Sequence, residues 1–212
     1  DQAEYDALNR VIASDQFSMG PEVSAFEDQF ARQFGSRYAV MTNSGSSANL
    51  LIMAALRYTK NDKINIAEGS EIIVPAVSWS TTYFPLQQYG LKLKFVDIDL
   101  NTLNYDLESL SQAVTDQTRA IMVVNLLGNP NNFDVINNII DHREIVMIED
   151  NCESMGATFN GREAGTFGIA GSYSGFFSHH ISTMEGGICV TDDEELYHVM
   201  LSIRAHGWTR NL

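Results

Sequence analysis

The chain has 212 residues, of which 44% are hydrophobic and 19% charged, as is usual for a globular protein with a sizeable core. Thirteen basic against 27 acidic side chains give a net charge of −14, which disfavours nucleic acid and anionic membrane as partners. No stretch approaches the roughly 20 apolar residues that span a bilayer, and no basic-then-apolar leader is visible. We therefore expect a cytoplasmic protein with no membrane partner.

Short apolar runs alternate along the chain with amphipathic segments, which is typical of a mostly parallel sheet covered by helices. Most of the runs are too uniformly apolar for strands that face solvent. We expect strands at residues 38–42, 71–75, 94–97, 120–126, 145–149, 172–176 and 187–191. We expect helices at residues 26–34, 46–58, 81–89, 107–113, 134–141 and 193–205, the last capped by Thr191 ahead of four acidic residues.

A serine-rich turn at residues 43–50 follows the first expected strand and opens a helix. Its small residues would let a phosphate approach, and the backbone N–H groups of Gly45, Ser46 and Ser47 would point at that phosphate. A turn of this kind is structural more often than it is functional, so the pattern alone does not establish a binding site.

Further polar and aromatic residues stand at the ends of expected strands. Asp150 and Glu153 follow the strand at 145–149, where open α/β sheets bind ligands. Without other support, a capping aspartate and a solvated glutamate would be the favoured interpretation. Trp79, on a strand-to-helix loop, would be assigned to core packing, and Ser174 would have no assignable role.

The most specific segment is residues 175–187, with the sequence GFFSHHISTMEGG. It resembles the cofactor-lysine segment of the sugar-nucleotide aminotransferases, a family of fold-type I pyridoxal phosphate enzymes. That family has a lysine six residues before the glutamate of Glu-Gly-Gly, and His179 stands at this position here. The resemblance runs along nearly the whole chain and also includes residues 26–30, 71–75, 95–99, 161–166 and 204–207.

The resemblance implies a fold and a cofactor site. The fold would be a three-layer α/β/α domain with a mainly parallel seven-stranded sheet, like the large domain of aspartate aminotransferase. Trp79 would stack on the cofactor ring, Asp150 would keep the pyridinium nitrogen protonated, and Glu153 would contact the ring hydroxyl. The cofactor phosphate would be held by residues of the serine-rich turn and by one later serine: Gly45, Ser46, Ser47 and Ser174.

Histidine in place of lysine changes the expected reaction. An imidazole cannot bond covalently to an aldehyde cofactor, but it can move protons near neutral pH. Pyridoxal phosphate or pyridoxamine phosphate would then be held non-covalently, with His179 as the catalytic base. We expect C3 dehydration of a 4-keto nucleotide sugar, GDP-linked by resemblance, with glutamate as amino donor. The spacing to Glu185 favours His179 over His180. For His206, both an approach to an active site across a dimer and a structural role stay open.

The resemblance also implies a homodimer with shared active sites. Residues 1–212 would form the large cofactor-binding domain, and the small C-terminal domain of the family is absent from this chain. One alternative is a relative that binds cofactor or nucleotide sugar without catalysis, and another is an aminotransferase whose lysine was replaced by mutation. A third, an iron–sulfur-dependent dehydrase, would need a cysteine-rich stretch near residues 210–212, which Cys152 and Cys189 are not placed to replace. We therefore expect no metal site.

Overall fold

The computed structural model describes residues 1–209, which fold around a seven-stranded sheet with the strand order β1-β9-β8-β5-β4-β2-β3. Strand β9 runs antiparallel to both of its neighbours, and the remaining neighbouring pairs are parallel. In sheet order the strands are Tyr38–Thr42 (β1), Gly187–Thr191 (β9), Ala170–Ser174 (β8), Val146–Asp150 (β5), Thr118–Val124 (β4), Glu71–Pro75 (β2) and Lys92–Val96 (β3). The loops that follow β1, β2, β4, β5 and β8 therefore meet along one edge of the sheet.

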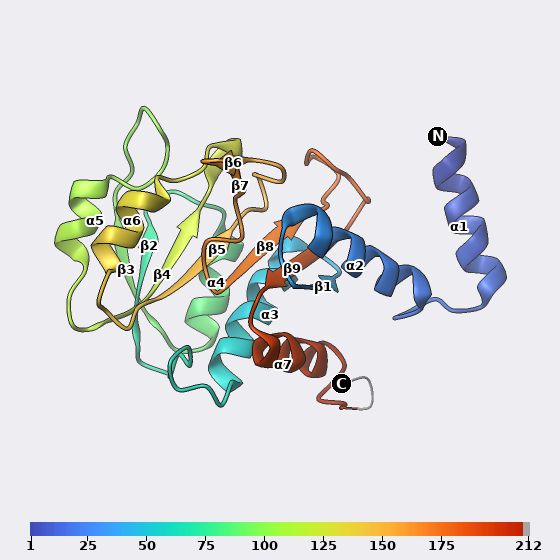
Figure 1. Ribbon diagram of the computed structural model, residues 1–212, viewed down its shortest axis with the longest axis horizontal. Coiled ribbons are helices and arrows are strands. Elements are labelled where there is room, and N and C mark those ends of the chain that lie inside the picture. Colours follow the sequence, from blue (N-terminus) through green and yellow to red (C-terminus); the bar gives the residue numbers. More distant parts are fainter. Residues whose placement is uncertain (210–212) are drawn as a thin grey trace.

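Helices cover both faces of this sheet (Figure 1). On one face α3, α4 and α7 pack on the inward side chains of β1, β2, β4 and β5, and on the other face α5 and α6 cover one half of the sheet while α2 covers the other. The helices are Gln2–Ser14 (α1), Pro21–Phe34 (α2), Gly45–Tyr58 (α3), Ser80–Gln88 (α4), Leu107–Ala113 (α5), Phe133–Ile140 (α6) and Glu194–Arg204 (α7), with a short 3₁₀ turn at Leu126–Gly128 (η1). The expected mainly parallel seven-stranded sheet in a three-layer α/β/α fold is confirmed.

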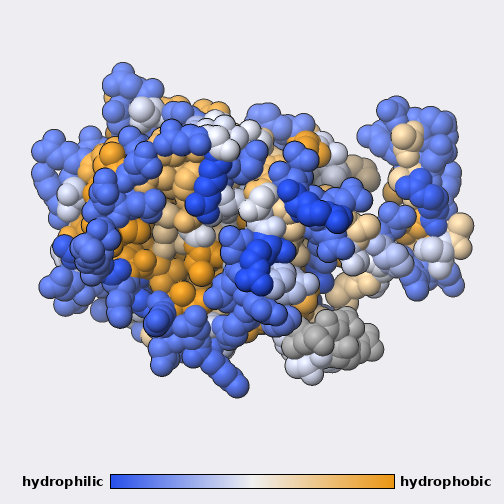
Figure 2. All heavy atoms as spheres, in the orientation of Figure 1, coloured by the Kyte–Doolittle hydropathy of each residue, from blue (hydrophilic) through white to orange (hydrophobic). Residues whose placement is uncertain are grey.

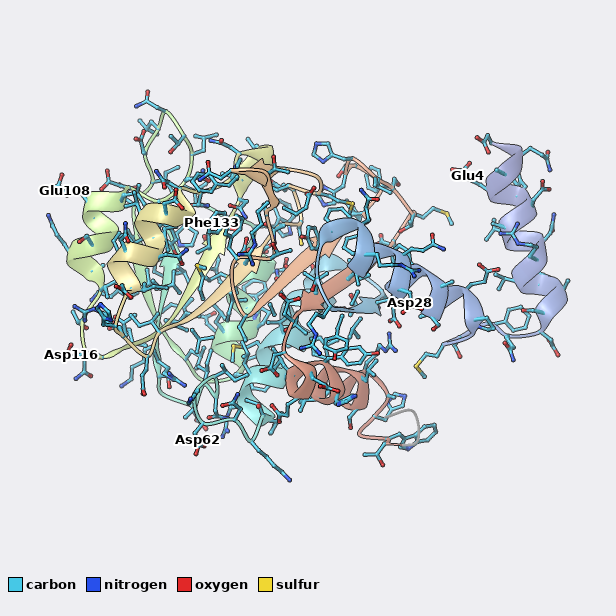
Figure 3. All side chains as sticks on the ribbon, in the orientation of Figure 1. Glu4, Asp28, Asp62, Glu108, Asp116 and Phe133 are labelled. Carbon is cyan, nitrogen blue, oxygen red and sulfur yellow. The ribbon has the colours of Figure 1, made fainter. Side chains whose placement is uncertain are left out.

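The core is layered because side chains alternate along each buried strand. Along β4, Met122 packs against the α3 side and Ile121 against the α5–α6 side. Phe133 anchors α6 to the sheet, since it is fully buried and stacks on Phe167 with 3.9 Å between ring centroids. Figure 3 shows Phe133 in the interior, whereas Glu108 lies at the periphery. Figure 2 shows mostly hydrophilic residues around the rim of the viewed face, in keeping with the acidic composition.

The structure corrects several details of the sequence analysis. Helix α1 was not expected; it contributes no buried residue and stands apart from the sheet (Figure 1). The short hairpin of β6 (Thr158–Phe159) and β7 (Arg162–Glu163) was also missed. The expected strands at 94–97, 120–126, 145–149 and 172–176 differ from the observed β3, β4, β5 and β8 by one or two residues at their ends. Backbone pairing between strands sets these ends, and the apolar runs do not coincide with the paired residues. The N-cap of α7 is Asp193 rather than Thr191, whose hydroxyl donates to the Ile169 carbonyl oxygen instead.

No helix among residues 1–209 combines the length and apolar character needed to cross a bilayer. Helix α3, the most apolar of the long helices, packs its hydrophobic face against the sheet, where Ala48, Ile52 and Leu56 are buried.

A buried carboxylate fixes the segment between β7 and β8. Glu149 is fully buried in β5, and its oxygens accept the backbone N–H groups of Gly165 at 2.6 Å and Gly168 at 2.7 Å. The Asn125 side-chain amide donates to the same carboxylate at 3.3 Å. Burial outweighs these hydrogen bonds and raises the pKa of Glu149 from 4.5 to about 7.

This raised pKa predicts a specific pH dependence of stability. Because the folded state binds the Glu149 proton more tightly than the unfolded state, the stabilisation is complete below about 4.5 and is lost as the pH rises towards about 7. The loss amounts to about 3 kcal/mol of unfolding free energy at most. We expect the advantage of wild type over Glu149→Gln, measured by urea unfolding, to shrink across this pH window. The exposed Glu108, changed to Gln, is the matched control, and a wild-type advantage that stays constant with pH would contradict the prediction.

Candidate active site

A pocket of about 290 Å³ lies at the edge of the sheet where the parallel strands end. Its walls come from the segments that follow β1, β2, β4, β5 and β8, so residues distant in sequence meet there. The expected site residues that line it are Gly45, Ser46, Trp79, Asp150, Glu153, Ser174 and His179. Ser47 is the expected residue that does not line the pocket.

The start of α3 forms one wall of the pocket. Ser44 is the N-cap, and its hydroxyl oxygen accepts the backbone N–H of Ser47 at 3.1 Å. The N–H of Ser47 is thus used within the helix start, whereas those of Gly45 and Ser46 have no acceptor inside the helix. Two backbone donors, with the positive end of the helix dipole behind them, are therefore available to an anion in the pocket.

Two glycines allow this helix start to lie directly on the sheet. A Cβ atom on Gly45 would lie 2.6 Å from the sulfur of Cys152 and 2.7 Å from the Cβ of Ser174. A Cβ atom on Gly187 would overlap the carbonyl oxygen of Ser44. Neither glycine has a positive φ, so close approach rather than backbone conformation requires glycine here. This packing sets the Ser174 hydroxyl beside the donors of α3.

Asp150 ends β5 at the floor of the pocket and is 5% exposed. Its Oδ2 accepts hydrogen bonds from Asn49 Nδ2 and from Thr82 Oγ1, each at 2.8 Å. Its Oδ1 accepts the backbone N–H of Cys152 at 3.2 Å. These donors fix the orientation of the carboxylate and compensate for its removal from water.

Asn49 and Thr82 are themselves held by further hydroxyl groups that the sequence analysis did not single out. Ser172 Oγ donates to Asn49 Oδ1 at 2.6 Å, and Ser78 Oγ lies 2.7 Å from Thr82 Oγ1. Asn49, Thr82 and Ser172 are almost completely buried. The sequence carried one signal for them, since a polar residue at a core-facing position of a helix needs a buried partner.

Trp79 and Glu153 line the pocket from the segments that follow β2 and β5. Trp79 is the residue before α4 and is 71% exposed, which rules out the core packing that its position alone had suggested. Glu153 Oε2 accepts the backbone N–H of Leu127 at 3.1 Å, and Leu127 has a left-handed backbone with φ 53°. The turn after β4 thus holds the Glu153 side chain in place.

His179 reaches the pocket from the loop that joins β8 to β9. Its backbone N–H donates to the Phe176 carbonyl oxygen at 2.9 Å, and both residues line the pocket. His180, the next residue, is exposed and does not line the pocket. His206 lies beyond the end of α7, where its ring is 6.2 Å from that of Trp208, and it is likewise outside the pocket lining.

Both cysteines are free thiols. Burial raises the pKa of Cys152 and of Cys189, so neither is an activated nucleophile. Within residues 1–209 no group of three or more His, Cys, Asp or Glu side chains could hold a metal ion. The expected start of a cysteine-rich stretch, residues 210–212, lies outside the described residues.

The fold is that of the fold-type I pyridoxal phosphate enzymes, and the pocket lies where its parallel strands end. Residues 1–211 match the DegT/DnrJ/EryC1/StrS aminotransferase family, and the chain belongs to that family.

Two similar curated proteins are both GDP-4-keto-6-deoxy-D-mannose 3-dehydratases. The one from Escherichia coli O55:H7 (strain CB9615 / EPEC) is 66% identical over 212 residues, which are 100% of this chain and 54% of that protein. The one from Yersinia pseudotuberculosis is 61% identical over 212 residues, 100% of this chain and 53% of that protein. The chain thus spans about half the length of these curated relatives.

Solved structures of enzymes with this name are also similar to this chain. The E. coli GDP-4-keto-6-deoxy-D-mannose 3-dehydratase with bound hydrated PLP has a TM-score of 0.97 and 66% identity, and the match covers 100% of this chain and 54% of that one. A structure of the same enzyme with one histidine changed to asparagine contains GDP-perosamine, with the same TM-score, identity and coverage. A further variant replaces a histidine and the serine directly before it.

The hydrogen bonds to Asp150 predict a stability effect. Asn49→Leu keeps the branched shape of the side chain but removes the donor to Asp150 and the acceptor for Ser172. We expect a loss of about 2–3 kcal/mol of unfolding free energy, because a buried carboxylate then lacks a donor. Urea unfolding measures the effect, with Asn138→Leu on the exposed face of α6 as the control. An unfolding free energy equal to that of wild type would contradict the network as described.

Proposed function

We propose that this chain is the large domain of a pyridoxal phosphate- or pyridoxamine phosphate-dependent C3 dehydratase of GDP-4-keto-6-deoxy-D-mannose. The product would be GDP-4-keto-3,6-dideoxy-D-mannose, with glutamate as amino donor. The observation that carries the proposal is His179, which lines the pocket at the position where the family has its cofactor lysine. The variants of the 66% identical relative fit this assignment, since Ser178–His179 is the Ser-His pair of this chain.

The pocket suits a pyridoxal cofactor that is not covalently bound. The donors of Gly45 and Ser46 with the Ser174 hydroxyl suit its phosphate, and the buried carboxylate of Asp150 suits its ring nitrogen. The pocket lining contains no lysine among the described residues, and the chain's lysines stand elsewhere: Lys60, Lys63, Lys92 and Lys94. Relatives with PLP and with a PLP–glutamate geminal diamine support this cofactor and this amino donor.

When bound, the cofactor supplies an electron sink for cleavage of the C3–O bond. Asp150 would hold a proton on its ring nitrogen, and Trp79 would stack on its ring. His179 takes a proton at an imidazole nitrogen and, once protonated, donates it to the hydroxide that leaves C3. Glutamate supplies the amino group, which departs as ammonia, and the two electrons that replace the C3 hydroxyl.

The resemblance supports several finer assignments. We infer that the complete protein adds a small C-terminal domain, forms a homodimer with shared active sites and works in the cytoplasm. Its product would supply colitose to the O-antigen of lipopolysaccharide. A protein that binds cofactor or nucleotide sugar without catalysis is less well supported, because a scaffold has no need of the hydrogen-bonded Asp150 carboxylate.

A product analysis tests the reaction. The complete protein is incubated with pyridoxal phosphate, glutamate and GDP-4-keto-6-deoxy-D-mannose, and the products are identified by mass spectrometry and NMR. We expect a 3-deoxy keto sugar and one ammonia per turnover. A stable amino sugar would instead identify an aminotransferase, and tight cofactor binding without turnover would identify a scaffold.

Substitution of His179 tests its role. We expect His179→Lys to bond covalently to the cofactor aldehyde and to lower deoxygenation by at least about 10³-fold, because the imidazole that would protonate the leaving hydroxide is lost. Borohydride reduction followed by mass spectrometry detects the covalent bond. The exposed His180, changed to Gln, is the matched control and should keep wild-type turnover. Unchanged deoxygenation in His179→Lys would remove His179 from the mechanism.

A further inference from the structure

The loop that carries His179 is closed at its base by a second set of contacts. Residues 175–186 connect β8 to β9, whose last ladder pair joins Ser174 to Gly187. The Gly175 N–H adds one more bond, to the Gly186 carbonyl oxygen at 2.8 Å. The Thr183 N–H then donates to the Gly175 carbonyl oxygen, also at 2.8 Å. The free part of the loop is thereby shortened to residues 176–182.

The Thr183 hydroxyl completes this closure. Its Oγ1 lies 3.3 Å from the Gly175 carbonyl oxygen and 3.2 Å from that of Glu185, and one hydroxyl proton can be donated to either acceptor. The Met184 backbone is left-handed, with φ 65°, which turns the chain back so that both acceptors face the same hydroxyl.

Two glycines leave room for this side chain. A Cβ atom on Gly175 would lie 2.6 Å from Thr183 Oγ1, and a Cβ atom on Gly186 would overlap the same oxygen. Neither glycine has a positive φ, so their requirement is space for Thr183. The second glycine of Glu-Gly-Gly, Gly187, serves a different contact, with the Ser44 backbone.

We propose that Thr183 is a positioning residue for His179: its hydroxyl, seated between Gly175 and Gly186, holds the loop in the conformation that places the imidazole in the pocket. The inference rests on the proposed function and extends it to a residue that does not line the pocket. The β8–β9 ladder is formed without the Thr183 hydroxyl, and residue 183 is exposed. Its contacts therefore serve the loop rather than the stability of the sheet.

The test compares Thr183→Val, which keeps the β-branched shape and loses the hydroxyl, with Thr183→Ser, which keeps the hydroxyl. In cofactor-free protein, we expect amide exchange in residues 176–182 to be about five- to tenfold faster in the valine variant, because one hydrogen bond is lost. The serine variant should stay close to wild type. Thr115→Val is the matched control, since the Thr115 hydroxyl also closes an exposed turn, through the Gln117 N–H, far from the pocket.

In the cofactor-loaded complete protein, we expect Thr183→Val to lower kcat on the order of 10- to 100-fold, because a displaced base loses its reacting geometry. KM and the cofactor dissociation constant should stay within about threefold of wild type. The urea midpoint should stay close to that of wild type. Thr183→Ser should restore most of kcat. Gly186→Ala should reproduce the loss, and its effect should shrink in a Thr183→Ala background, where the overlapping oxygen is absent.

Three results would overturn the proposal: unchanged exchange in Thr183→Val, a valine variant with full kcat, or a fall in kcat matched by equal losses of folding stability and cofactor binding. If wild-type protein performs no dehydration, the proposed function fails. The amide-exchange comparison still decides whether Thr183 holds the loop.

Discussion

The candidate site depends on close contact between the start of α3 and the backbone of β8 and β9. Gly45 and Gly187 permit this contact, because a methyl group at either position would meet the neighbouring segment. The contact brings the N–H groups at the helix start beside Ser174, and it directs Asn49, one turn further along α3, at Asp150. One packing constraint thereby orients two parts of the pocket, the anion-binding wall and the acidic floor.

The same contact explains how a strongly acidic chain can offer a site for an anion. No lysine or arginine is found among the pocket-lining residues that the structure describes, whereas Asp150, Glu153 and Glu185 are. The favourable potential for a phosphate comes from unpaired backbone donors at the helix start and from the helix dipole. The carboxylates Asp150 and Glu153 accept hydrogen bonds from neighbouring protein groups, and these bonds fix the orientation of both carboxylates.

Much of the architecture could be predicted from the sequence because buried parallel strands are short apolar runs with distinct turn residues. The strands at Tyr38–Thr42, Glu71–Pro75 and Gly187–Thr191 have the expected bounds. Helix α1 was missed although Tyr5, Leu8 and Ile12 recur at helical spacing. These three side chains are exposed, and no residue of α1 is buried.

The site was predictable to the extent that its residues stand at strand ends or in the Glu-Gly-Gly segment. Sequence cannot show which of three neighbouring N–H groups a cap will use, and so the inclusion of Ser47 with Gly45 and Ser46 could not be refined. Asn49 and Thr82 were missed for a related reason, since their role arises only when separate helices bring them to Asp150. Thr183 likewise acts through loop closure, which no local pattern encodes.

The exchange of lysine for histidine changes what must hold the reacting groups together. A lysine bonded to its cofactor fixes its own position, because the covalent bond restricts both partners. An imidazole has no such bond, so its position depends on the loop that carries it. Under the proposed function the cofactor would depend separately on α3, Asp150 and Trp79. The contacts at the base of the 175–186 loop and the hydrogen bonds around Asp150 therefore meet two separate requirements. In the proposed site without a tether, preorganisation of base and electron sink by the protein would replace the bond.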